Sequence, residues 1–140
     1  MTTASRRSGC LVAVLLPAIF DLGCAADAAP PGGVRLTSQA GAYSAVALPD
    51  PNPAHVGRNA LRFDVVEQGG DPVAGALLEV FPWMPAHGHT TSSLPVVAEG
   101  DGGVYQVEHL DYPMPGQWEI RIDVTTADAT DRFSFVLDVH

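Results

Sequence analysis

The sequence contains no lysine, and its only basic side chains are 7 arginines, set against 16 acidic residues. The formal net charge is therefore −9 at pH 7. Such a chain has little with which to neutralise a row of phosphates, which argues against nucleic acid as a partner. The same balance argues against binding to an anionic lipid surface. Metal cations and basic proteins suit the acidic surface better.

Cysteine is almost as scarce as lysine. Cys10 and Cys24 are the only two, and both lie near the N-terminus. Cys10 would be lost with a cleaved leader, so a mature chain would keep one thiol at most and could form no intramolecular disulfide. The fold must then be stabilised by packing alone, even in an oxidising compartment.

No apolar run is long enough to cross a bilayer as a helix. The run at residues 11–20 spans about half of the roughly 20 residues that a transmembrane helix needs. It follows Arg6 and Arg7, a pattern typical of a signal peptide, and we predict a leader over residues 1–29. We therefore expect an exported protein.

Two processing sites in this leader lead to two destinations. Residues 21–24 (DLGC) resemble a bacterial lipobox, in which Cys24 would be lipidated, although Asp21 departs from the apolar residue preferred there. Residues 26–28 (ADA) form the alternative A-x-A cleavage site. The first predicts an outer-membrane lipoprotein that touches the membrane only through its lipid anchor, and the second a soluble periplasmic or secreted protein.

Helical periodicity is absent beyond the leader, and 14 glycines and 12 prolines favour turns. We predict a flexible linker over residues 30–42, which are rich in small residues, proline and glycine. From residue 43 to residue 140, short apolar runs alternate with turn signals, as in an all-β, immunoglobulin-like β-sandwich of about seven strands. The expected strands are 43–48, 59–67, 75–82, 93–99, 103–110, 117–126 and 131–139.

Two segments concentrate sulfur and imidazole, one between the third and fourth expected strands and one before the sixth. The candidate metal ligands in them are Met84, His87, His89 and Met114. Thioether and imidazole together suit Cu(I) and Cu(II) and are poorly suited to Ca²⁺ or Mg²⁺. The cofactor that this set predicts is a copper ion.

The expected topology gives an independent reason to group these residues. If successive strands alternate in direction, the connections that hold the candidate ligands all lie at one end of the sandwich. The same end would also hold His55, His109 and His140. If the third and sixth strands pair, Met84 and Met114 become neighbours.

The same side chains also have a purely structural interpretation. Met84 and Met114 can fill irregular gaps at the end of the core, and His87 and His89 can be exposed loop residues without a ligand. Trp83 and Trp118 fit core or rim positions. The sequence contains no G-x-S-x-G nucleophile elbow, no phosphate-binding glycine loop and no calcium loop, so we expect no enzyme.

Four short motifs resemble those of the YtkA-like domain family. They are the turn at residues 71–76, the segment 81–89 with its Met-Pro and His, the Gly-x-Tyr hairpin at 103–105, and the Met-Pro-Gly-x-Trp start of a strand at 114–118. The resemblance covers residues 43–139. It implies a β-sandwich of the bacterial envelope, similar to the periplasmic part of FixH-type proteins and to CopC-type copper domains, with a copper or heavy-metal association.

The resemblance places Met84, His89 and Met114 on motif positions of that family. His87 stands where many relatives carry methionine, which implies a ligand set richer in nitrogen. We therefore expect an exported domain that binds a copper-type ion as its main partner. The alternative is a non-catalytic structural or interaction module that meets another envelope protein and holds no metal.

Overall fold

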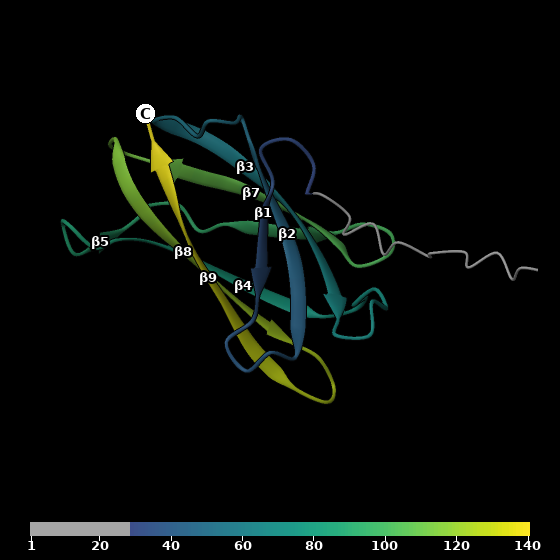
Figure 1. The fold of residues 1–140 in the computed structure, drawn as a ribbon. Helices are drawn as coiled ribbons and strands as arrows, with labels where there is room; N and C mark the ends of the chain where they lie inside the picture. Colours follow the sequence, from purple (N-terminus) through teal and green to yellow (C-terminus); the bar gives the residue numbers. More distant parts are fainter. Residues whose placement is uncertain (1–28) are drawn as a thin grey trace, which may run out of the picture.

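The computed structural model describes residues 29–140, so residues 1–28 of the predicted leader, with Cys24, lie outside the described range. Within this range the chain forms two antiparallel sheets that pack as a β-sandwich (Figure 1). One sheet has the order β1-β2-β3-β7-β6 and the other the order β5-β4-β8-β9. The strands are β1 (Val34–Thr37), β2 (Tyr43–Asp50), β3 (Gly57–Glu67), β4 (Leu77–Met84), β5 (His89–Thr90), β6 (Val96–Glu99), β7 (Val104–Tyr112), β8 (Gly116–Thr125) and β9 (Thr130–Val139). The described part contains no helix that could cross a membrane.

Alternating burial along the strands builds the core between the two sheets. In β8 every second residue from Trp118 to Val124 is completely buried, and in β9 the alternation runs from Asp131 to Val139. One face of each strand is therefore dry, as its period of two predicts. Phe63 of β3 and Phe133 of β9 meet edge to face across the sandwich, with ring centroids 5.2 Å apart.

The expected all-β sandwich is confirmed, and all seven expected strands are present with shifted ends. Two short strands, β1 and β5, were not expected. β1 lies inside residues 30–42, so the prediction of a flexible linker there is wrong for residues 34–37. The sequence gives no sign of β1, because this edge strand is mostly exposed and shows no alternation.

The Gly-x-Tyr hairpin has a clear physical basis. Gly103 has a positive φ of 74°, and a Cβ at this position would lie 2.6 Å from the Val65 carbonyl oxygen. Only glycine fits such a close approach of two backbone segments. The Tyr105 hydroxyl, two residues later, donates to the Val73 carbonyl at 2.8 Å and accepts the Ala76 N–H at 3.0 Å. The motif therefore ties β7 to the segment before β4.

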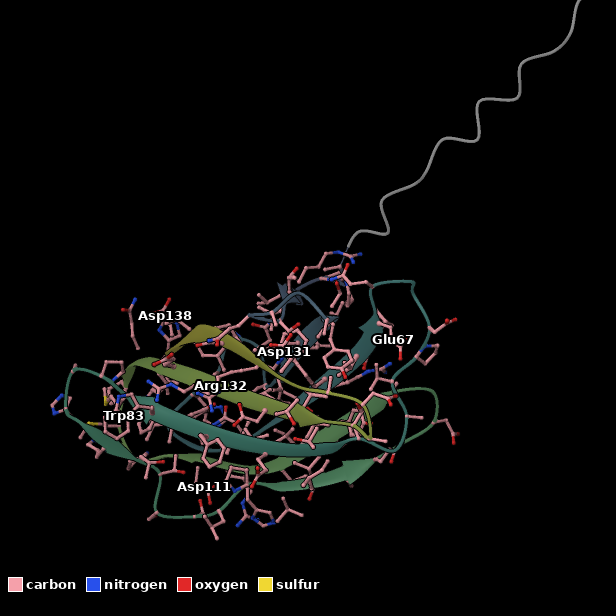
Figure 2. All side chains as sticks on the ribbon, turned by 90° about the horizontal axis from the view of Figure 1, so that it is seen from below. Glu67, Trp83, Asp111, Asp131, Arg132 and Asp138 are labelled. Carbon is pink, nitrogen blue, oxygen red and sulfur yellow. The ribbon has the colours of Figure 1, made fainter. Side chains whose placement is uncertain are left out.

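One long side of the sandwich is closed by hydrogen bonds. Asp131 at the start of β9 is 6% exposed, and its carboxylate accepts the N–H groups of Ala40 and Ala42 from the β1–β2 turn. The Gln39 N–H donates to the Arg132 carbonyl nearby. These bonds join the edge of one sheet to the edge of the other, and Figure 2 shows the labelled Asp131 and Arg132 on this side.

Candidate functional site

A tight turn between β4 and β5 carries three of the four candidate ligands. The Met84 carbonyl at the end of β4 accepts the N–H groups of His87 and Gly88, at 3.2 and 2.9 Å. Gly88 has a positive φ of 67°, which suits glycine at the last position of such a turn. Met84 and His89 are directly opposite each other in the β4–β5 pair, so their side chains share the inner face of the sheet.

The two imidazoles of this turn lie next to each other. Their ring centroids are 5.9 Å apart, with His87 exposed and His89 partly buried. Nδ1 of His89 lies 3.1 Å from the carbonyl oxygen of Thr90. A carbonyl can only accept, so Nδ1 is the donor in this hydrogen bond, and in a neutral ring the lone pair lies on Nε2. Histidines that bind a metal through one ring nitrogen usually donate from the other nitrogen to a carbonyl or carboxylate, and this hydrogen bond of His89 is of that kind.

The two methionines converge on the start of β8. Met84 is 3% exposed and belongs to the core, whereas Met114 is partly buried and packs against it. A Cβ on Gly116 would lie 2.7 Å from the terminal methyl carbon of Met84. Met84 therefore reaches the residue two positions beyond Met114, which agrees with the expected pairing of β4 with β8. Figure 2 draws the sulfur atoms, in yellow, at the end of the molecule where Trp83 is labelled.

Trp118 connects both parts of the cluster. Its indole ring meets the His89 ring edge to face with centroids 5.5 Å apart, and its Nε1–H donates to the Met114 carbonyl at 3.2 Å. Trp118 is completely buried, so its expected core position is confirmed. The contact of Trp118 with His89 could not be predicted from the sequence. The contact with Met114 had a signal, namely the fixed spacing of Met114 and Trp118 within one motif.

The other histidines lie at the same end but do not join this cluster. His140 and the loop with His55 are held together by backbone hydrogen bonds, from Val56 N–H to His140 O and from His140 N–H to Ala54 O. His109 has a positive φ of 61° and lies where the pairing of β3 with β7 shifts register. The connections that carry the histidines thus lie at one end of the sandwich, as expected. Among the five histidines, only the rings of His87 and His89 lie side by side.

Nitrogen and oxygen ligands alone do not make a metal site in residues 29–140, where no three His, Cys, Asp or Glu side chains gather. The carboxylates of β8 are already paired with arginines. The Arg121 guanidinium donates to Glu119 and lowers the pKa of that carboxyl, and Arg132 does the same for Asp123. Within residues 29–140, a site of three or more side-chain ligands at this end would therefore need the methionine sulfurs.

Tyr112 adds a polar atom beneath the cluster. Its ring centroid lies 5.2 Å from that of Trp118, and the residue is 1% exposed. Its hydroxyl has no hydrogen-bond partner among the described residues. Burial raises the pKa of the Tyr112 phenol well above its ordinary value of 10.0, so the group stays neutral.

Comparison with protein families gives a match to the YtkA-like model over residues 37–123. Among solved structures, the chain is similar to a DUF4426 family protein from Pseudomonas aeruginosa PAO1, with a TM-score of 0.55 and 13% sequence identity. That likeness covers 77% of this chain and 94% of the other, and at this identity it concerns the fold. No curated protein matches the sequence.

Proposed function

The chain belongs to the YtkA-like family, and we propose that it binds a copper-type ion through Met84, His87, His89 and Met114 at one end of the sandwich. The domain would act as a carrier, sensor or buffer of the ion and not as a catalyst. We further propose that the protein is exported, either as a soluble periplasmic protein or as a lipoprotein anchored through Cys24.

The spacing of the two imidazoles carries this proposal. An ion bound to an imidazole nitrogen lies about 3.2 Å from the ring centroid, because the metal–nitrogen bond is about 2.0 Å and the ring adds about 1.2 Å. Two rings on one ion are thus at most about 6.4 Å apart. The 5.9 Å between the ring centroids of His87 and His89 lies within this limit.

The chemistry of the remaining donors favours copper over zinc. Zinc sites in proteins use nitrogen, thiolate and carboxylate ligands, and this cluster offers two imidazoles and two thioethers. Thioether sulfur is a soft ligand that selects Cu(I). Met84 and Met114 would supply it from the inner side, while His87 and His89 would close the site toward solvent.

Competition titrations of the full chain with Cu(I) against a colorimetric chelator test this proposal. Replacing both imidazoles (His87→Ala/His89→Ala) should weaken Cu(I) binding by at least about tenfold, since two of four ligands are lost. The matched control is His55→Ala/His140→Ala, which removes two histidines from the same end and should leave the affinity unchanged. A Trp83→Phe background leaves Trp118 as the only tryptophan, and its fluorescence should change as the ion binds beside His89.

Equal losses in the two double variants would contradict the proposal, because they would indicate nonspecific binding to histidine. Equal affinity for Cu(I) and Zn²⁺ would also contradict the proposal, because thioether ligands should favour Cu(I). The burial of Met84 favours a second candidate, a structural or interaction module in which both methionines only fill the core. Met114→Leu distinguishes the two, because it should lower copper affinity in the first case and have no effect on copper in the second.

A further inference from the structure

The sheet that contains β4 is incomplete along the first part of that strand. β4 pairs with β8 from Leu77 to Trp83, whereas on its other side β5 pairs only with Trp83 and Met84. The opposite sheet continues further, through β7 to β6. Over residues 77–81, β4 is therefore an edge strand that faces the end of a longer sheet, and Figure 1 shows how short β5 is beside it.

The backbone groups at this edge can be assigned from two hydrogen bonds. The carbonyls of Pro82 and Met84 both point toward β5, because they accept from the Thr90 hydroxyl and from the turn. Peptide groups alternate along a strand, so those of Leu78 and Val80 point to the same side, away from β8. β5 does not extend to these residues, which leaves the N–H and C=O groups of both without a partner strand within residues 29–140.

Apolar side chains gather along the same edge. A groove of about 390 Å³ runs between β4 and β6 and is lined mainly by aliphatic and aromatic residues. Seven large apolar residues of the described chain are exposed, and three of them line this groove. They are Leu77 (62% exposed), Phe81 (48%) and Leu94 (87%). A row of unpaired backbone groups beside such a groove is the arrangement that accepts an added strand.

Charge argues against a second copy of this chain as the natural occupant. Suppose that β4 pairs with β4 of another copy in the antiparallel register in which Leu78 of each copy lies opposite Val80 of the other. Glu79 then lies directly opposite Glu79. Like charges directly opposite each other destabilise a strand pair. Glu79 is exposed, and it favours a strand that carries a basic residue at this position. The net charge of −9 favours a basic partner in the same way.

We propose that the edge of β4 at Leu78 and Val80 is a docking site for an extended segment of a partner protein. The segment adds a strand to the sheet, with a Lys or Arg side chain opposite Glu79. Its alternate side chains are apolar and enter the groove, where they cover Val97 of β6. The backbone of β4 supplies the affinity, and Glu79 and the groove supply the selectivity.

A fluorescently labelled peptide, Val-Thr-Val-Lys-Val-Thr-Val with blocked ends, tests the docking site on the full chain by fluorescence anisotropy. Its central lysine is placed to face Glu79, and its two flanking valines to pair with Leu78 and Val80. We expect saturable binding that weakens about tenfold when the flanking valines are N-methylated, because two hydrogen bonds are lost. A peptide with glutamate at the centre should also bind more weakly.

Two variants of the protein separate the backbone and charge contributions. Val80→Pro removes one edge N–H and should weaken binding, and circular dichroism must show that the fold is retained. Glu79→Lys is exposed and should reverse the preference, so that the glutamate peptide binds better than the lysine peptide. Failure of the lysine peptide to bind at millimolar concentration would overturn the proposal, as would equal binding of the N-methylated peptide. A wild-type dimer in sedimentation that Val80→Pro dissociates would assign the edge to a second copy instead.

Discussion

Replacing Tyr112 by phenylalanine should stabilise the protein, although the tyrosine is buried in the core. The Tyr112 hydroxyl has no hydrogen-bond partner among the described residues, and the side chain is 1% exposed. Burial of an unpaired hydroxyl costs about 1–3 kcal/mol, and phenylalanine keeps the ring contact with Trp118. We expect the free energy of unfolding to rise by at least about 1 kcal/mol at pH 7. In a domain of this size, this raises the melting temperature by about 4 °C.

The pH dependence of this variant provides a second test. The folded chain keeps the Tyr112 phenol neutral, because burial raises its pKa well above 10.0, while the unfolded chain ionises near pH 10. Stability that is fully present below pH 10 is therefore lost as the pH rises further, by up to about 1.4 kcal/mol per pH unit. Tyr112→Phe removes this loss, so its advantage over the wild type should grow above pH 10.

Tyr105→Phe is the matched control, because it removes the same atom from a buried tyrosine with both hydrogen bonds made. The Val73 carbonyl and the Ala76 N–H lose their partner, and we expect a destabilisation of about 1–3 kcal/mol. Urea denaturation of both variants and the wild type measures the difference. Equal destabilisation by the two substitutions would refute the reasoning, because it would show that the Tyr112 hydroxyl is satisfied in solution.

Two further predictions concern the turns that hold the sheets together. Gly103→Ala should destabilise the protein by several kcal/mol more than Gly102→Ala, because an added Cβ meets rigid backbone only at Gly103; thermal denaturation of both variants checks this. Asp131→Asn should cost about 1–3 kcal/mol at pH 7. Burial raises the pKa of Asp131, but the hydrogen bonds to its carboxylate have the larger combined effect and lower the pKa below 3.8. The stability that this carboxylate adds is therefore lost as the pH falls below that value. Urea denaturation between pH 2 and 7 should therefore show a flatter acid limb for Asp131→Asn, and parallel acid limbs would contradict this assignment.

The strands with clear alternation could be predicted from the sequence, and those without it could not. β8 was predicted to within one residue because each second side chain is apolar and faces a core that covers its whole length. β1 and β5 are held in place by their neighbours instead. β1 is an exposed edge strand, and β5 contains only His89 and Thr90, so neither has a pattern of its own. Tertiary pairing defines such strands.

The candidate site shows the same division. The sequence supplied the residue types and the topology, which were enough to predict that β4 pairs with β8 and that Met84 lies close to the start of β8. The burial of Met84 and Met114 could not be predicted, because nothing in the sequence shows how far a flexible thioether extends into the core. The role of Trp118 under His89 depends on a contact between β5 and β8, two strands that are not neighbours in the sheet.

The shortness of β5 links the candidate metal site to the docking edge. The chain leaves the sheet after Thr90, turns with a hydrogen bond from the Thr91 hydroxyl to the Ser93 carbonyl, and crosses to the other sheet, where β6 begins at Val96. Two residues of β5 are enough to place His89 opposite Met84, and they leave the rest of β4 uncovered. A strand docked at Leu78 and Val80 would extend the line of β5. Residues 80 and 84 are about 13 Å apart along an extended strand, so a docked segment of ordinary length ends beside the turn that carries His87 and His89.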